Sequence, residues 1–192
     1  AQTKPAIAAL AAGGFVISWS SEVSLGVDAN SIAAGGEGAF NSVSVDIMAR
    51  RFEPNGAPSG DEFKVNTAPY ICANSAVAAA SDGGFCVAWE QADKLVATNS
   101  LDIWARSYDS SGTALSAPQI VNATTYGDQY TPVIAAQGNN YFVAWTSLGQ
   151  DGSFEGIFAR ALTLTGTPVG DEFLVNTTTL NRQLYPSIAA DA

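Results

Sequence analysis

The most informative absence in this sequence is histidine, because the chain contains none among its 192 residues. Without histidine, the Ser-His-Asp and Cys-His nucleophile systems are excluded, and so is every zinc site that uses a histidine ligand. Two cysteines are too few for a zinc site made of four cysteines. Any chemistry must therefore use carboxylates, Arg, Lys, Tyr or the two thiols.

Basic residues are also scarce: the chain has eight Lys and Arg against 18 Asp and Glu, a net charge of −10. They are scattered, whereas nucleic acid and anionic membranes attract a clustered cationic surface. No apolar run reaches the roughly 18 residues of a membrane-spanning helix. We therefore expect no nucleic-acid partner and no membrane insertion. Acidic, weakly charged chains of this kind are common outside cells, so we expect an extracellular or cell-surface location.

Helical patterns are the third absence. Charged residues make up only 14% of the chain, and no window keeps an apolar period of 3.6 residues for long enough to predict a helix. Gly, Ser, Thr and Asn instead separate short groups of Val, Ile, Phe, Tyr and Trp. This mixture predicts many short strands joined by tight turns.

What the sequence has in abundance is an internal repeat. The segments GGFVISW, GGFCVAW and NNYFVAW each end in a tryptophan, at Trp19, Trp89 and Trp145. An arginine recurs downstream of each, and an asparagine follows sixteen residues later: Arg50, Arg106 and Arg160, then Asn66, Asn122 and Asn176. Arg50 and Arg106 each lie 39 residues before the next Trp, whereas the Trp-to-Arg distance falls from 31 to 17 and 15. One connection in the repeat therefore varies in length.

The pattern of each repeat predicts four strands. The segment that ends in tryptophan is apolar on both faces, with Phe15, Ile17 and Trp19 on one face and Val16 on the other. Such a strand is a central strand covered above and below. We therefore predict an all-β fold, a β-propeller-like array of four-stranded antiparallel blades. The alternative is a β-sandwich, which uses about seven strands per unit.

The repeat divides the chain into three blades and part of a fourth. Blade 1 spans residues 1–69 with a long insertion at about 20–45, blade 2 spans 70–126, blade 3 spans 127–183, and residues 184–192 resemble the first strand of a further blade. Propellers close with about 4–8 blades. We therefore expect the partners of this chain to be further repeats of the same parent chain or other copies of itself.

The pattern GGFxVAW…DGSxxGIxARxx…GTPVGDEFxVNT…YPSIAA resembles a repeat of large secreted and surface proteins of bacteria, often found with haemolysin-type calcium-binding repeats. The match is closest in residues 130–190, whereas blade 1 departs by its insertion and blade 2 by LSAPQIVNA in place of GDEFLVNT. The resemblance implies an extracellular, non-catalytic, propeller-like module. It implies no particular ligand and no set of binding residues.

The recurrent Arg and Asn residues are predicted to be structural. An Arg at the end of the third strand can hold carbonyl groups or an Asp of an adjoining strand with its five donors, and the competing interpretation is an anion site. The Asn is expected to shape the turn after the fourth strand. Cys72 and Cys86 flank a hairpin and occur only in blade 2, which predicts a disulfide in an extracellular chain. The alternative is a buried free thiol.

The loop GQDGSFEG at residues 149–156 is the candidate metal site. Asp151, Ser153 and Glu155 stand at alternate positions with glycines among them, and clustered oxygens in a tight loop are ligands that Ca²⁺ prefers. The alternative is a polar hairpin tip. The sequence requires no cofactor, and calcium is the one that it favours.

We expect the chain not to be an enzyme. The carboxylate pairs Asp61–Glu62 and Asp171–Glu172 are adjacent in sequence, so their side chains point to opposite faces of a strand and form no glycosidase dyad by themselves. The main interpretation is a non-catalytic structural or adhesive module of a larger extracellular protein. The first alternative is a lectin-like propeller in which Trp104 and Tyr residues stack on glycans. The second is a carboxylate-based glycosidase or lyase fragment with a dyad assembled from two blades.

Overall fold

In the part of the chain that the structure describes, every regular element is a β-strand. A computed structural model describes residues 1–24, 43–67, 71–92 and 101–191. The first sheet contains β1 (Gln2–Ala9), β2 (Phe15–Ser24), β3 (Val43–Phe52) and β4 (Phe63–Lys64); the second contains β5 (Cys72–Ala79), β6 (Phe85–Gln91), β7 (Asp102–Tyr108) and β8 (Gln119–Ile120); the third contains β9 (Gln129–Gln137), β10 (Asn140–Leu148), β11 (Glu155–Thr163) and β12 (Pro168–Leu174). The described residues include no helix of the length and apolarity that a bilayer crossing needs.

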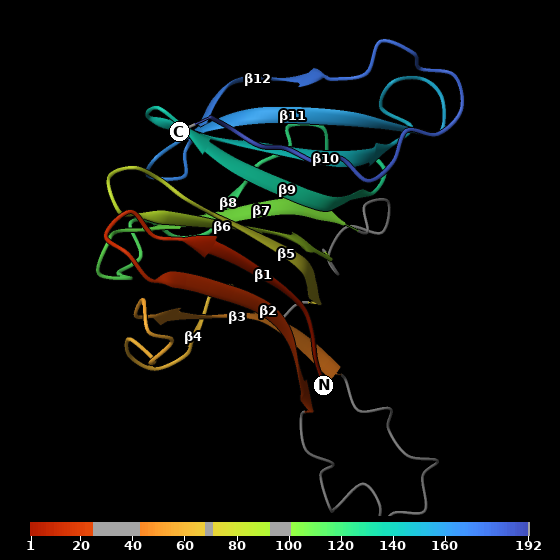
Figure 1. Cartoon of the computed structure of the whole chain (residues 1–192). Helices are drawn as coiled ribbons and strands as arrows, with labels where there is room; N and C mark the ends of the chain where they lie inside the picture. The colour runs from red at the N-terminus through yellow and green to blue at the C-terminus, as the bar shows by residue number, and fades with distance from the viewer. Residues whose placement is uncertain (25–42, 68–70, 93–100, 192) are drawn as a thin grey trace, which may run out of the picture.

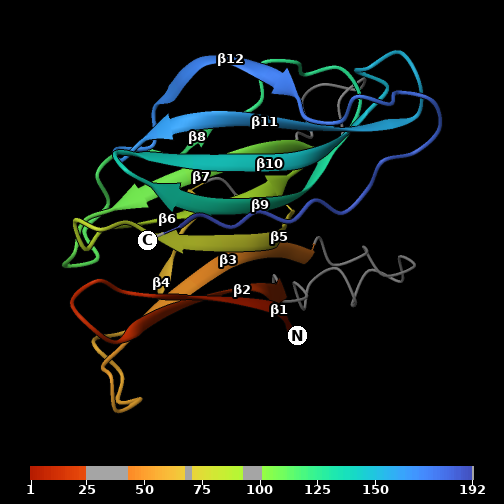
Figure 2. The same ribbon diagram turned by 45° about the horizontal axis from the view of Figure 1, so that its top comes forward.

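Each sheet is antiparallel, and its strands follow one another in sequence order. The sheets are stacked as three layers, with β1, β5 and β9 on the same side of the stack (Figures 1 and 2). These three inner strands line a common axis, and the two-residue strands β4 and β8 lie at the outer edge with β12. The predicted fold class is confirmed: the chain is an all-β, propeller-like array of four-stranded antiparallel blades. The three described sheets form an arc.

One face of each blade packs on the opposite face of the next. Blades 1 and 2 meet in an apolar cluster of Val16, Ile47, Ala49 and Val65 with Val77, Phe85, Val87, Trp89 and Tyr108. The equivalent positions meet again between blades 2 and 3, in the cluster of Ala88, Ile103, Ala105 and Val121 with Ile134, Tyr141, Val143, Trp145 and Leu162. The same alternating strand therefore serves two interfaces, which explains why the apolar heptapeptide recurs.

The three recurrent tryptophans are not equally covered. Trp89 and Trp145 are fully buried, each against the preceding blade. Trp19 is only partly buried, because it lies on the face of blade 1 that no described blade covers. The three tryptophans are therefore equivalent in the repeat but not in burial, and Trp19 marks an end of the arc.

The recurrent arginines join neighbouring blades. Arg106 donates from Nη1 to the carbonyl oxygen of Val65 in blade 1, at 3.0 Å. Arg160 donates in the same way to the carbonyl oxygen of Val121 in blade 2, at 2.9 Å. Both carbonyls belong to the residue that directly follows the fourth strand of the preceding blade. Charge-assisted bonds of this type are stronger than those between neutral groups, so each Arg fixes the spacing of two sheets.

The recurrent asparagines hold the short outer strands against the third strands. Asn122 Oδ1 accepts the backbone N–H of Ile103 at 2.7 Å, and its Nδ2 donates to Asp102 at 2.6 Å. Asn66 and Asn176 make the same backbone bond at 2.8 and 2.7 Å. Because β8 has only two residues in its ladder, this side chain supplies part of the pairing that a longer strand would make.

Residues 25–42, most of the blade 1 insertion, lie outside the described residues, as does residue 192. Residues 184–191 run near the axis without belonging to a strand. Residues 184–191 therefore form no strand in the described chain, and their assignment to a further blade stays a prediction.

The unequal burial of the tryptophans leads to a stability prediction. Replacing Trp89 or Trp145 with Ala should lower the free energy of unfolding by about 3–5 kcal/mol, the range for large buried aromatic residues. Trp19→Ala should cost less than half as much, because part of its ring is already exposed. Urea denaturation of the three variants measures this difference, and equal losses would contradict the assignment of Trp19 to an uncovered face.

Candidate functional site

The inner strands carry the same backbone irregularity in every repeat. Lys4, Asn74, Thr131 and Tyr185 are non-glycine residues with φ of 51°, 50°, 51° and 58°, in the left-handed region. The first three lie where the pairing of the inner strand with the second strand shifts, as in a β-bulge. Such a conformation costs about 1–3 kcal/mol per residue. Its recurrence shows that the fold holds this position strained whatever side chain occupies it.

The four strained positions surround one hollow beside the axis, here called the axial pocket. It has a volume of about 300 Å³ and is lined by Lys4, Asn74, Thr131 and Tyr185 with their neighbours Pro5, Ser75, Pro132, Val133 and Pro186. Each repeat therefore contributes a different polar group at the equivalent position: an ammonium, an amide, a hydroxyl and a phenol. Strained residues gather at ligand sites in many proteins, which makes this pocket the first candidate.

A buried carboxylate links two sides of the axial pocket. Glu90, which is 7% exposed, accepts a hydrogen bond from Asn74 Nδ2 at 2.5 Å and another from the backbone N–H of Thr131 at 2.9 Å. Lys4 donates from Nζ to Asn74 Oδ1, so a continuous chain of bonds runs from an ammonium to a carboxylate. The hydroxyl groups of Thr131 and Thr146 also form a hydrogen bond, at 3.1 Å. The pocket is therefore pre-organised by contacts between all three blades.

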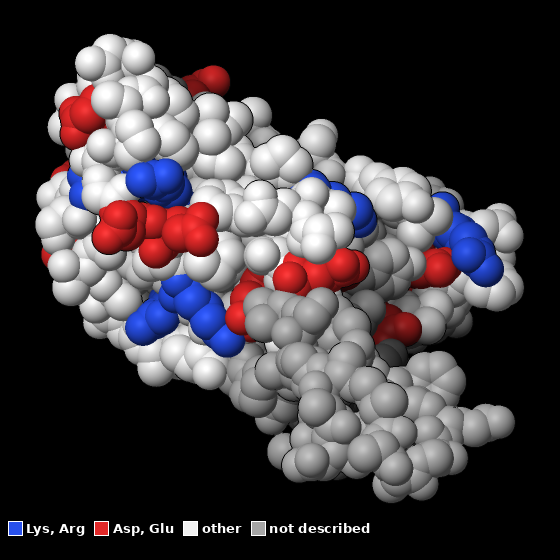
Figure 3. Space-filling view, turned by 90° about the horizontal axis from the view of Figure 1, so that it is seen from below, with Lys and Arg blue, Asp and Glu red and all other residues white. Residues whose placement is uncertain are grey.

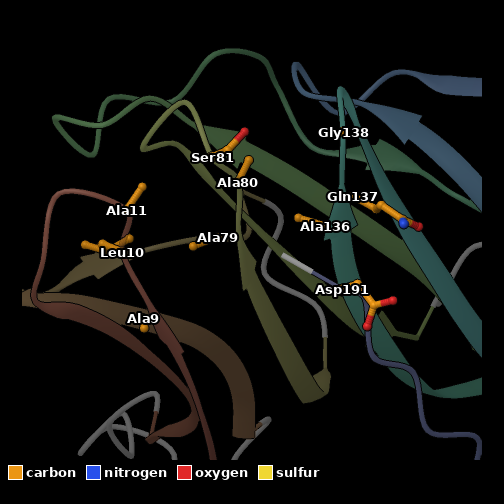
Figure 4. Close-up of a pocket in the computed structure, with 10 residues that line it drawn as sticks. All are labelled: Ala9, Leu10, Ala11, Ala79, Ala80, Ser81, Ala136, Gln137, Gly138 and Asp191. Atoms are coloured by element: carbon orange, nitrogen blue, oxygen red, sulfur yellow. The ribbon is translucent and has the colours of Figure 1, made fainter.

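A larger hollow lies at the opposite end of the inner strands. It has a volume of about 560 Å³, and Figure 4 shows the turns that follow β1, β5 and β9 around it, with Ala9, Ala79 and Ala136 beside it. Asp191, Ser81 and Gln137 are its polar side chains. Alanine side chains provide space but no hydrogen bonds, so this hollow is a poorer candidate for recognising a polar ligand.

The charged surface gives no support to a nucleic-acid site on the face that Figure 3 shows. Among the described residues there, Lys and Arg side chains stand as separate spots between Asp and Glu side chains. A phosphate backbone is bound by several neighbouring basic groups that follow its path. The arrangement therefore favours ligands recognised by individual polar groups.

The residues predicted to bind calcium do not converge on one point. Asp151 Oδ1 accepts the backbone N–H of Ser153 at 3.0 Å, and the Asp151 carboxylate fills the space beside the Cα of Gly156. Glu155 points to the other face of β11, where Arg182 donates to its Oε1 at 3.3 Å. Among the described residues, no three His, Cys, Asp or Glu side chains form a metal-binding group. Calcium at these residues stays a prediction.

Two carboxylate oxygens in this loop have an unusual environment. Asp151 Oδ2 and Glu155 Oε2 are buried and accept no hydrogen bond in the described part of the chain. Buried polar atoms are normally paired, so each such atom requires a partner such as water or an ion. Because the two side chains lie on opposite faces of β11, they call for two separate partners.

The predicted disulfide between Cys72 and Cys86 is wrong. Both cysteines are free and fully buried. Cys72 packs between blades 1 and 2 and bonds to Gln91 Oε1 at 3.4 Å, whereas Cys86 packs between blades 2 and 3. The two thiols therefore lie on opposite faces of one sheet. The alternative of buried free thiols describes both residues.

The sequence reasoning missed the axial pocket and Glu90. A usable signal was present, because three of the four strained residues precede a proline, in Lys4-Pro5, Thr131-Pro132 and Tyr185-Pro186. A proline within a strand indicates an irregularity such as a bulge, and its recurrence at one repeat position indicates an architectural one. Trp104, the residue considered for sugar stacking, instead pairs with Trp89 across β6 and β7.

Comparison with known proteins gives structural matches only. No family model matches the sequence, and no curated protein matches it. Among solved structures, the chain is similar to the GH43 endo-arabinanase from Bacillus licheniformis, with TM-score 0.47 and 11% identity over 93% of this chain and 60% of that chain. It is also similar to the alpha-L-arabinofuranosidase from Lactobacillus brevis, with TM-score 0.46 and 10% identity over 79% of this chain and 46% of that chain. The chain thus spans about half the length of these structures.

These matches correct two expectations. Both matched proteins are named as glycosidases, which overturns the interpretation of the chain as a non-catalytic structural or adhesive module and the expectation that it is not an enzyme. Likeness at this level concerns the fold and assigns no residue or substrate, so any choice of catalytic group depends on the geometry of this chain.

The buried cysteines give a prediction about thiol reactivity. Burial raises the pKa of Cys72 and of Cys86 to about 12, so both remain protonated at neutral pH, and the thiolate is the reactive form. A chromogenic thiol reagent should therefore detect neither thiol in the folded chain. In denaturant without reductant it should detect both, whereas a disulfide would leave none to react.

Proposed function

We propose that this chain is part of a carbohydrate-hydrolysing β-propeller that holds its substrate at the axial pocket. The observation that carries the proposal is the convergence of Lys4, Asn74, Thr131 and Tyr185 on one pocket, with the buried carboxylate of Glu90 behind them. An ammonium, an amide and hydroxyl groups are the partners that sugar hydroxyls need, and the phenol ring of Tyr185 adds an apolar face with a polar tip.

Glu90 is the carboxyl group that we assign to the chemistry. Each of its oxygens accepts one hydrogen bond, from Asn74 and from Thr131, so the carboxylate lies directly behind two residues that line the pocket. Glycoside hydrolysis uses two carboxyl groups on either side of the scissile bond, about 5–10 Å apart. In this proposal Glu90 supplies one of them, and a blade that faces it across the axis supplies the other. One carboxyl protonates the leaving oxygen while the other activates water or attacks the anomeric carbon.

The remaining expectations belong to the same proposal. An extracellular or cell-surface location fits an activity on polysaccharides, which are too large to enter cells. The resemblance to bacterial secreted repeats fits that location, and calcium at Asp151, Ser153 or Glu155 stays a prediction. Because the chain has no histidine, carboxylates are the side chains best suited to act as its acid and base.

The test of hydrolysis uses Glu90→Gln, which keeps the shape of the side chain and removes its charge. On a panel of polysaccharides that includes arabinan, the variant should lose at least about a hundredfold in turnover, the scale of general acid–base catalysis. The matched control is Glu53→Gln, which changes an exposed glutamate in the turn between β3 and β4. A variant at Glu90 with unchanged turnover would contradict the assignment, as would a wild-type chain that hydrolyses no member of the panel.

A second candidate function is lectin-like binding of carbohydrate without turnover. It is favoured by the lining of the axial pocket itself, which contains Lys4, Asn74, Thr131 and Tyr185 but no carboxylate. Under this alternative the pocket binds sugar through hydrogen bonds and ring contact, and Glu90 only positions Asn74 and Thr131.

Tyr185 provides the prediction for sugar binding. Its side chain is 75% exposed beside the pocket, so Tyr185→Ala should weaken the affinity for oligosaccharides at least about fivefold without lowering the melting temperature. Isothermal titration measures the affinity, and Tyr126→Ala, at another tyrosine that is 74% exposed, serves as the control. Equal affinities for both variants would place sugar binding elsewhere. Binding without turnover in the wild-type chain would favour the lectin over the hydrolase.

A further inference from the structure

The outer face of blade 1 is an interface without its partner. This face comprises Ile7, Phe15, Ile17, Trp19 and Met48. In the β1, β2 and β3 ladders Ile7 pairs with Ile17 and Trp19 pairs with Met48, and Phe15 lies two residues along β2 from Ile17. Ile7 is 64% exposed, whereas its counterpart Val77 in blade 2 is 8% exposed. Blades 2 and 3 both cover the equivalent face with the preceding blade. The residues of blade 1 have therefore kept an apolar packing surface that nothing in the described chain covers.

A hydrogen-bond donor and an acceptor are also left over at the two ends of the arc. Arg106 and Arg160 reach the preceding blade, at Val65 and Val121 respectively. The equivalent Arg50 bonds only to Gly60 of its own blade within the described chain, at 3.0 Å. At the other end, the carbonyl of Val175 takes the place of Val65 and Val121.

That carbonyl accepts no hydrogen bond from the described residues, and Val175 is 51% exposed. The donor of blade 1 thus matches the acceptor of blade 3.

A glutamate makes a second recurring contact between neighbouring blades. Glu172 of blade 3 accepts the backbone N–H groups of Ala123 and Thr124 behind blade 2, at 2.7 and 2.9 Å, and the hydroxyl of Thr124 at 2.5 Å.

Blade 1 has a glutamate at the equivalent position, Glu62, which is exposed. The residues equivalent to Ala123 and Thr124 behind blade 3 are Thr177 and Thr178, so the same amide and hydroxyl donors are present there. Blade 2 has Pro118 at this position and makes no such contact. Apolar surface, an Arg donor and a Glu acceptor therefore all fit blade 1 to a blade of the blade 3 type.

We propose that the outer face of blade 1 binds blade 3 of a second copy of this chain, so that two copies close a ring. Each copy has three blades, and two copies give six, within the roughly 4–8 blades of closed propellers. A head-to-tail contact that closes after two subunits forms a symmetric dimer with two identical interfaces. In this dimer Arg50 donates to Val175 of the partner, and Glu62 accepts from Thr177 and Thr178 of the partner.

The C-terminal segment must give way in this arrangement. Tyr185 therefore lines the axial pocket only in the single chain, and in the dimer Lys4 of the partner, at the equivalent repeat position, takes its place. Residues 184–191 occupy the place beside blade 3 that β1 of the second copy takes, because both are first strands of the repeat. No hydrogen bond to these residues is present in the described chain, and Tyr185 is 75% exposed. Strand β1, in contrast, is paired with β2 along most of its length. Strand β1 of the second copy is therefore expected to displace residues 184–191 from blade 3, because β1 is already held in a sheet and residues 184–191 are not.

The mass of the chain in solution tests the proposal. Sedimentation equilibrium should give twice the chain mass of 19.8 kDa. Trp19→Arg and, separately, Arg50→Ala should each weaken the dimer by at least about thirtyfold, the level of interface hot spots. Tyr126→Arg, which changes an exposed residue between blades 2 and 3, should leave the mass unchanged. Circular dichroism verifies that each variant is folded, and Arg50→Ala keeps the test open if Trp19→Arg does not fold.

A double variant tests the register of the contact. Glu62→Cys with Thr177→Cys should form a disulfide between chains in the oxidised dimer, because the two native thiols are buried and do not compete. A wild-type chain that is monomeric at micromolar concentration would overturn the proposal and leave a preceding repeat of a longer chain as the occupant of this face. Open polymers of varying mass would overturn the closed ring.

Discussion

The whole structure depends on one constraint: a four-stranded sheet with two apolar faces cannot bury both of them by itself. A blade in this stack buries one face against the blade before it and the other face against the blade after it. Three recurrent residues support this stacking. The tryptophan fills the space between two sheets, the arginine bonds one blade to the next, and the asparagine holds the outer strand to its own sheet. Quasi-one-dimensional repeat proteins share this dependence on neighbours. At the two ends of the arc, a blade face therefore has no neighbouring blade in the described chain.

The sequence predicted the blades because the signals for them are local and periodic. Alternating apolar residues around Trp89 place it in a central strand, and the constant spacing from Arg106 to Trp145 defines the repeat. The disulfide between Cys72 and Cys86 could not be judged in this way. Their separation in sequence is compatible with a bridge, but the decisive fact is the sheet face on which each thiol lies.

The candidate site was harder to predict for a related reason. Glu90 directly follows Trp89 and looks like the end of a strand, and its importance arises from Asn74 in the same blade and Thr131 in the next one. Contacts between repeats are set by the twist and spacing of the sheets, which no short segment encodes. The absence of histidine was likewise informative about mechanism but excluded only some enzymes, since carboxylates alone can hydrolyse a glycosidic bond.

At the strained inner-strand position, the backbone conformation does not depend on which side chain is present. Lysine, asparagine, threonine and tyrosine occupy it with nearly the same φ, so the fold tolerates wide chemical variation at the point that faces the axis. A duplicated blade can therefore acquire a new contact with ligand by a single substitution there, without any change in the packing between sheets. The number of repeats and the chemistry of the ligand site can then evolve independently, because one residue position in each blade varies while the blade fold stays the same.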